Sequence, residues 1–157
     1  MSWVLRLIGL FYAATGIVYV RTYATNAVAD KLLAALEGPP PAKERIKRWW
    51  LTLGAALTVA SGLALLTLSW WILPLMLVNL VVQGGWLVYA RAAFPPEDED
   101  DLRGRRQTTN AFYVWCGATA LALFALMGDR SLIESGMIQS LLPPVGGLAL
   151  FAWLIVQ

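Results

Sequence analysis

The feature that most constrains this chain is a set of long stretches without any charged side chain. Such stretches cover residues 7–20, 49–90, 107–128 and 135–157. A helix needs about 20 apolar residues to cross the hydrocarbon core of a bilayer, which is about 30 Å thick. Charged residues make up only 14% of the 157 residues, whereas soluble domains carry roughly 25%. We therefore expect a single all-α integral membrane domain.

The apolar stretches divide into four predicted spans, at about 3–20, 49–68, 72–91 and 108–127. Because Arg6 lies inside the first apolar run, we interpret that run as a retained span and not as a cleaved signal peptide. The segment TLSWWILP must hold the whole turn between the second and third spans, and Pro74 suits the start of the returning helix. These two spans are predicted to form a tight antiparallel hairpin.

Residues 137–157 are apolar enough for a fifth span, but Pro143 and Pro144 predict a kink in it. Prolines are tolerated in a membrane where neighbouring groups satisfy the carbonyls that they leave free. Only about 21 Å of helix is available after Pro144, so a surface segment followed by a re-entrant helix is the alternative. The expected fold is a polytopic helical bundle of four spans plus a kinked fifth, and the side of the C-terminus stays open.

Residues 22–37 are too polar to cross a bilayer. On a helical wheel Val28 and Leu32 fall on one arc, and Asn26 and Asp30 on the other. This pattern predicts an amphipathic helix on the cytoplasmic side, lying on the membrane or against the bundle, or a first span that continues past the headgroups. The prolines of GPPPAKERIKR then end the helix.

The distribution of basic residues predicts the orientation. If the N-terminus lies outside, ten of the twelve basic residues fall in loops 21–48 and 91–107, and only Arg6 and Arg130 remain outside. Basic residues gather on the cytoplasmic side, so we expect these loops in the cytoplasm, at the inner membrane of a bacterium. The tryptophans agree with this orientation, with Trp3, Trp70 and Trp71 at the outer interface and Trp49 and Trp50 at the inner one.

The charged loop predicted at 92–107 contains five successive acids, residues 97–101. Hard cations prefer such oxygen ligands, but carboxylates that follow one another on an extended loop do not converge. We interpret the acids as a solvated, mobile hairpin loop and expect no metal site. Arg103, Arg105 and Arg106 follow, and they are candidates for contact with anionic lipid headgroups.

Polar side chains inside the spans are amides and hydroxyls. Asn79, Gln83 and Trp86 share one face of the third predicted span. They either line a solute or pore site or hold helices together through hydrogen bonds. Asn110 and Tyr113 form a similar stripe near the cytoplasmic end of the fourth span.

Small residues recur at intervals of three or four in the first two spans, and this spacing allows close helix packing within the chain or between chains. They are Gly9, Ala13 and Gly16, and Gly54, Thr58 and Gly62.

Several chemistries lack their residues. The chain has no histidine and one cysteine, Cys116, which excludes intrachain disulfides and histidine acid–base chemistry. Between their flanking residues, spans two to five hold no Asp, Glu, Lys or Arg, which disfavours ion-coupled transport. No nucleophile with a base and no Walker, Rossmann or zinc pattern occurs. We expect no catalytic residue, no metal and no cofactor.

Three classes of function remain. We favour a non-catalytic accessory or scaffold subunit whose partners are membrane lipids, another membrane protein or a second copy of itself, and not nucleic acid. The alternative is a small homo-oligomeric transporter or channel for an uncharged or amphipathic solute. The third, a lipid-modifying enzyme using residues 91–106, lacks an acid–base pair. A cavity that reaches Asn79 would favour the transporter.

Overall fold

The computed structural model describes residues 1–38, 41–96, 98–133 and 136–156, with the side chains of 23–31, 33–34 and 37 left out. Within these ranges all the regular secondary structure is helical. Its elements are α1 (Ser2–Glu37), α2 (Ala42–Leu66), α3 (Ile72–Ala93), α4 (Glu99–Gly128), the short 3-10 helix η1 (Arg130–Leu132) and α5 (Met137–Val156). Each of the five α-helices is long and apolar enough to cross a membrane. The all-α bundle with a fifth span-length helix is therefore confirmed, and it is compatible with an integral membrane protein.

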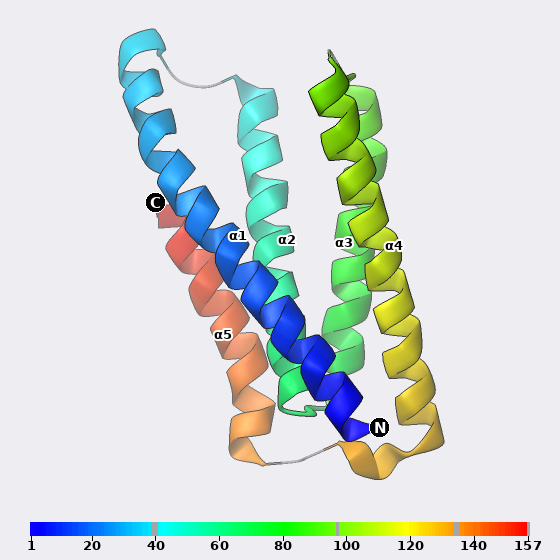
Figure 1. Cartoon of the computed structure of the whole chain (residues 1–157). Coiled ribbons are helices and arrows are strands. Elements are labelled where there is room, and N and C mark those ends of the chain that lie inside the picture. Colours follow the sequence, from blue (N-terminus) through cyan, green and yellow to red (C-terminus); the bar gives the residue numbers. More distant parts are fainter. Residues whose placement is uncertain (39–40, 97, 134–135, 157) are drawn as a thin grey trace.

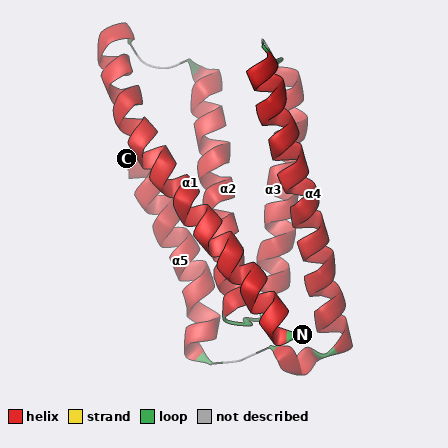
Figure 2. Ribbon diagram, viewed as in Figure 1, coloured by secondary structure: helices red, strands yellow, loops and turns green. Residues whose placement is uncertain are grey.

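The helices run up and down between two ends of the bundle (Figure 1). One end carries Met1, the turn at 67–71 and η1, and we call it the N-terminal end. The other carries residue 38, residues 94–96 and most of the basic residues, and we call it the basic end. α2 packs against α1, α3 and α5, and α4 packs against α3. α1 and α4 approach each other near the N-terminal end and diverge toward the basic end, as the uniformly helical ribbon of Figure 2 also shows.

The contact between α1 and α2 is made through backbone. A Cβ added at Gly62 would lie 2.5 Å from the Ala13 nitrogen, and one added at Gly9 would lie 2.5 Å from the Leu66 nitrogen. A Cβ at Gly16 would overlap the side chain of Val59. Small residues let two helices approach this closely where lipid offers no hydrophobic drive. The structure thus places Gly9, Ala13, Gly16 and Gly62 at a contact within one chain.

The turn at 67–71 ends α2 in a Schellman motif. The Ser69 amide donates to the Ala64 carbonyl at 2.9 Å and the Leu68 amide to the Leu65 carbonyl at 3.3 Å. Leu68 takes a φ of 52°, where glycine is usual, and its side chain is buried in the core. The carbonyl of Leu66 accepts from the Arg6 guanidinium at 3.1 Å. The helix dipole also stabilises a positive group at the C-terminus of a helix.

α5 is one helix that runs through Pro143 and Pro144. Proline has no N–H, so Pro144 leaves the carbonyl of Ser140, four residues earlier, without its helical donor. The indole N–H of Trp71 donates to that carbonyl at 2.9 Å. A side chain of the α2–α3 turn therefore supplies the hydrogen bond that the proline removes, which is how a proline becomes tolerable at depth.

Three helices extend beyond their predicted apolar spans. α2 begins at Ala42 instead of 49, and α4 at Glu99 instead of 108. Residues 22–37 continue α1, so of the two alternatives the continued first span is the one observed and a separate amphipathic helix is not. No glycine or proline occurs between 17 and 37 to end the helix earlier. Apolar windows mark the hydrocarbon depth, whereas helices continue through charged residues that favour helix. Among the four residues used to predict an amphipathic face in 22–37, Leu32 is exposed. The side chains of Asn26, Val28 and Asp30 lie outside the described residues.

The loop predicted at 92–107 is mostly helix, and this corrects our interpretation of the acidic stretch. Asp98 caps α4, since its carboxylate accepts from the Asp101 amide at 2.7 Å. Glu99, Asp100 and Asp101 form the first turn, where negative side chains are stabilised by the helix dipole. Glu97 lies outside the described residues. The described acids therefore start a helix and do not form a solvated loop.

Candidate functional site

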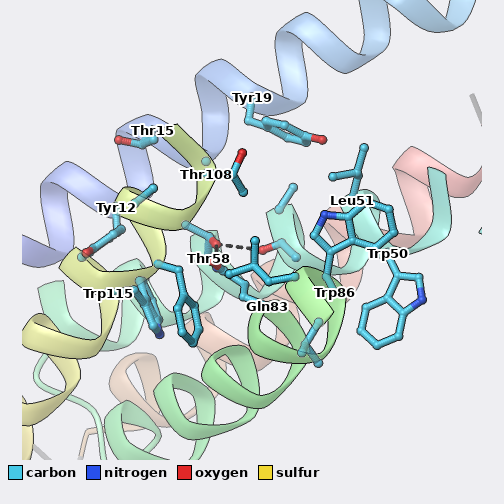
Figure 3. Close-up of a pocket in the computed structure, with 17 residues that line it drawn as sticks. Tyr12, Thr15, Tyr19, Trp50, Leu51, Thr58, Gln83, Trp86, Thr108 and Trp115 are labelled. Carbon is cyan, nitrogen blue, oxygen red and sulfur yellow. Dashed lines mark hydrogen bonds between the residues drawn. The ribbon is translucent and has the colours of Figure 1, made fainter. Parts of the chain in front are cut away.

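A cavity of about 270 Å³ lies among α1, α2, α3 and α4 (Figure 3). It is larger than the cavities of about 150 Å³ that hold benzene in engineered protein cores. Its lining residues are Tyr12, Thr15, Gly16, Tyr19, Trp50, Leu51, Gly54, Ala55, Thr58, Val82, Gln83, Trp86, Leu87, Thr108, Ala111, Phe112 and Trp115. Because α1 and α4 diverge toward the basic end, the cavity occupies the space that opens between them.

The floor and the mouth of the cavity come from different helices. The lining residues of α2 and α3 are all buried or half-buried. By contrast, Thr15 and Tyr19 on α1 and Thr108 and Ala111 on α4 line the cavity and are also exposed. The cavity therefore rests on α2 and α3 and opens between α1 and α4. In a bilayer such an opening would face lipid or a neighbouring subunit.

A polar patch lies on the floor of the cavity. The Thr58 hydroxyl donates to the Gly54 carbonyl at 2.8 Å, as threonine often does in a helix. Its oxygen accepts from the Asn79 amide at 3.2 Å and from the Gln83 amide at 3.4 Å. The Gln83 amide also donates to the Asn79 carbonyl oxygen at 3.0 Å. The dashed line in Figure 3 joins Thr58 and Gln83.

The wall toward the basic end is aromatic. The Trp50 ring lies 6.3 Å from the Trp86 ring, centroid to centroid. Phe94 lies 6.0 Å from Trp86 and carries the ammonium of Lys47 over its face at 5.6 Å. Gly85 adjoins this wall, since a Cβ placed there would lie 3.5 Å from the Trp50 ring. Trp50, predicted as an interfacial anchor, therefore forms part of the cavity wall.

The cavity ends toward the N-terminal end at a pair of aromatic rings. The rings of Tyr12 and Trp115 meet edge to face, with centroids 4.4 Å apart. The Trp115 indole N–H donates to the Met76 carbonyl at 3.4 Å, which ties α4 to α3. Both rings belong to a core cluster that also includes Leu5 and Ile72, which are fully buried. Of the buried residues described in that cluster, Tyr12 and Trp115 line the cavity and the others do not.

The predicted face of the third span is split by depth. Gln83 and Trp86 line the cavity, whereas Asn79 is fully buried behind it and reaches it only through its hydrogen bonds to Thr58 and Gln83. The structure places Asn110 and Tyr113 elsewhere, on the outer surface of α4, where both are exposed. Successive residues of a helix turn by about 100°, so the inward face carries 108, 111, 112 and 115 instead.

Several lining residues carried no signal by which the sequence alone could have identified them. The spacing of Thr58 from Gly54 and Gly62 predicts helix packing. In the structure the Thr58 hydroxyl oxygen accepts from Asn79 of α3, and both Thr58 and Gly54 line the cavity. The residues of α1 and α4 that line the mouth look like ordinary lipid-facing positions. An i, i+3, i+4, i+7 pattern in Thr108, Ala111, Phe112 and Trp115 indicates one face, but not what that face contacts.

The arginines before the fourth span lie on the first turns of α4 and not in a loop. Arg103 and Arg106 are exposed. Arg105 donates to the carbonyl of Phe94, the residue that follows the last turn of α3. One of the three lipid-headgroup candidates therefore bonds to the chain's own backbone, and two face outward at the basic end.

The chemistry of the cavity is that of an uncharged binding site. Among the described residues that line it there is no aspartate, glutamate, lysine or arginine. Its polar atoms are hydroxyls, indole N–H groups and one amide side chain, which favours recognition by shape and hydrogen bonds. Comparison of the chain with protein-family models, with curated proteins and with solved structures finds no match.

Proposed function

We propose that this chain is a non-catalytic integral membrane protein that binds an uncharged, amphipathic molecule, such as a lipid, in the cavity among α1 to α4. The observation that carries the proposal is the lining itself, with aromatic and aliphatic walls, a small polar patch and no ionised group among the described residues. Burial of an ion without a partner costs several kcal/mol or more. The same lining supports an uncharged ligand and gives catalysis no acid–base pair.

The exposed residues at the mouth support entry from the bilayer. Thr15 and Thr108 satisfy their own hydroxyl protons by donating to the carbonyls of Phe11 and Gly104. Neither residue therefore requires water at that depth. A ligand that already partitions into the bilayer reaches such a mouth without first crossing water.

The basic end is part of the proposal. Lys43, Arg45, Arg91, Arg103 and Arg106 are exposed at or near that end, and basic residues concentrate on the cytoplasmic side. We therefore propose that the basic end faces the cytoplasm at a bacterial inner membrane, with the N-terminus outside. The cavity then lies in the cytoplasmic half of the membrane, where each basic residue near an anionic leaflet contributes about 1 kcal/mol of attraction.

Filling the cavity tests the proposal. No atom lies within 4 Å of a Cβ placed at Gly54, and Gly54 lines the cavity, so Gly54→Leu adds a side chain there without meeting backbone. Binding is followed by quenching of tryptophan fluorescence with 4-bromoanisole, an uncharged ring, and with the anion 4-bromobenzoate. Trp50, Trp86 and Trp115 line the cavity. We expect saturable quenching by the uncharged ring only, and its loss in Gly54→Leu.

The matched control is Gly117→Leu. Gly117 also has no atom within 4 Å of an added Cβ, but it is exposed on α4 and does not line the cavity. This variant should keep the saturable quenching, while non-specific partition of the probe into detergent is the same in both variants. Equal saturable quenching by the anion, or quenching that survives in Gly54→Leu, would refute the proposal.

Transport of such a molecule is a second candidate, and the closed end of the cavity favours it over an open channel. The Tyr12–Trp115 pair and the core cluster separate the cavity from the N-terminal end. A transporter open to one side has this arrangement, whereas a channel needs a continuous path. Efflux of 4-bromoanisole from vesicles does not distinguish transport from binding alone, because this probe crosses lipid unaided. The assay therefore needs a slowly permeating uncharged amphiphile such as octyl glucoside. Flux that Asn79→Leu with Gln83→Leu abolishes would assign transport.

A further inference from the structure

The hydrogen bonds of the polar patch fix which groups it offers to a ligand. Thr58 has a single hydroxyl proton and gives it to the Gly54 carbonyl, so its oxygen only accepts from the neighbouring amides. Asn79 must therefore turn its NH₂ toward Thr58, which leaves its carbonyl oxygen to accept from Gln83. The direction of the Thr58 hydroxyl proton therefore fixes which side of each amide is NH₂ and which is oxygen, because amide orientation is assigned from hydrogen-bond partners.

Gln83 is the end of this chain of hydrogen bonds. Its NH₂ has two protons, one directed to Thr58 and one to the Asn79 oxygen. Within the described residues no donor reaches its carbonyl oxygen, and that oxygen is not among the buried atoms without a partner. Since Gln83 is half-buried and lines the cavity, its carbonyl oxygen is an unpaired acceptor that remains accessible.

No hydrogen bond joins the other described donors around the cavity to this acceptor. The Trp115 indole N–H is taken by the Met76 carbonyl. The Tyr12 hydroxyl is buried without a partner. Trp50 and Trp86 lie toward the basic end, across the cavity from Tyr12 and Trp115 in Figure 3. The polar patch therefore offers the Gln83 oxygen as an acceptor without a donor, and such an acceptor in an apolar cavity costs free energy.

We propose that the molecule bound in this cavity carries a neutral hydrogen-bond donor, a hydroxyl or phenol group, which it donates to the Gln83 carbonyl oxygen. The inference rests on the proposed function and specifies the ligand class within it. An alcohol- or phenol-headed amphiphile satisfies the acceptor and places its apolar part against the aromatic wall. A ketone, ester or ether of the same shape has only acceptors, so it leaves the Gln83 oxygen unpaired, and sites of this kind discriminate against such analogues.

A matched pair of probes tests this preference. 4-Bromophenol, neutral at pH 7, and 4-bromoanisole differ by replacement of the hydroxyl proton with a methyl group, and both quench tryptophan. We expect the wild-type chain to bind the phenol about three- to tenfold more tightly than the ether, the range for one neutral hydrogen bond. In Gln83→Met, which keeps the length of the side chain and loses the acceptor, the two affinities should become equal. The difference between the variant and the wild type cancels partition of the probes into detergent.

A second variant protects the test against misfolding of the first. Thr58→Val keeps the shape of residue 58 and removes its oxygen, so one Gln83 N–H is released toward the cavity. The preference for the phenol should then fall, because the floor offers a donor as well. Gly54-sensitive binding of both probes with equal affinity in the wild type would overturn this inference and leave the proposed function intact. Absence of any Gly54-sensitive binding would overturn both.

Discussion

The two halves of the bundle use the same kinds of residue for different purposes. In the N-terminal half, which comprises 2–13, 59–80 and 113–128 of α1 to α4, small residues bring backbones into contact and the core cluster fills the interior. In the basic half, which comprises 14–22, 42–58, 81–93 and 99–112, α1 and α4 diverge and the cavity opens. α2 runs through both halves, with Gly62 pressed against α1 and Gly54 on open space.

The halves also differ in whether certain carbonyl oxygens, of the backbone or of a side chain, find a donor within the chain. In the N-terminal half Arg6 donates to the Leu66 carbonyl and Trp71 to the Ser140 carbonyl. In the basic half the Gln83 oxygen has no donor within the described residues. Two hydroxyls of the N-terminal half, those of Tyr12 and Ser61, are buried without a hydrogen-bond partner. This difference supports the proposal that the Gln83 oxygen of the basic half is available to a ligand.

The largest expected effect separates two glycines of α2. Gly62→Ala places a Cβ 2.5 Å from the Ala13 nitrogen and 2.9 Å from the Gly9 carbonyl oxygen, so the helices must separate. We expect it to destabilise the fold by about 1–3 kcal/mol or more. Gly54→Ala meets no atom within 4 Å and should leave stability unchanged or raise it, since alanine favours helix. Unfolding in mixed detergent micelles, followed by circular dichroism, measures both. Equal stability of the two variants would break the comparison.

An intermediate effect is expected at the turn that supports α5. Trp71→Phe keeps most of the ring and removes the donor to the Ser140 carbonyl, at a cost of about 0.6–2 kcal/mol. Pro144→Ala restores the helical N–H that this carbonyl lacks. In the Pro144→Ala background Trp71→Phe should therefore cost less, and a double-mutant cycle measures the difference. A coupling free energy near zero would show that the indole bond does not compensate for the proline.

The sequence predicted the spans better than the site. Absence of charge over about 20 residues has one physical explanation, so the number of span-length helices followed from it. Helix ends differ from the predicted spans by nine residues at the start of α4, at Glu99 instead of 108, and by 17 at the end of α1, at Glu37 instead of 20, because helices continue through charged residues beyond the apolar core. Gln83 and Trp86 were found because polar and aromatic side chains at one face are uncommon at depth. Thr58 and the mouth residues were missed, since the angle between α1 and α4 decides which of their faces enclose space.

The smallest expected effect is a pH dependence of stability at the N-terminal end, where the Asp129 carboxylate accepts hydrogen bonds from Ser131. The Ser131 hydroxyl donates to Asp129 at 2.6 Å and the Ser131 amide at 3.0 Å. These two bonds, the hydroxyl first, lower the pKa of Asp129 below its ordinary value of 3.8. A lowered folded-state pKa means that the stabilisation is present above pH 3.8 and is lost as the pH falls through the folded-state pKa. The effect is small because the carboxylate is exposed to solvent.

Asp129→Asn keeps an acceptor for Ser131 and cannot titrate, so between pH 5 and pH 3 its melting temperature should fall less than that of the wild type. If the two melting temperatures fall in parallel, the Ser131 bonds do not lower the pKa of Asp129 in the folded state relative to the unfolded state.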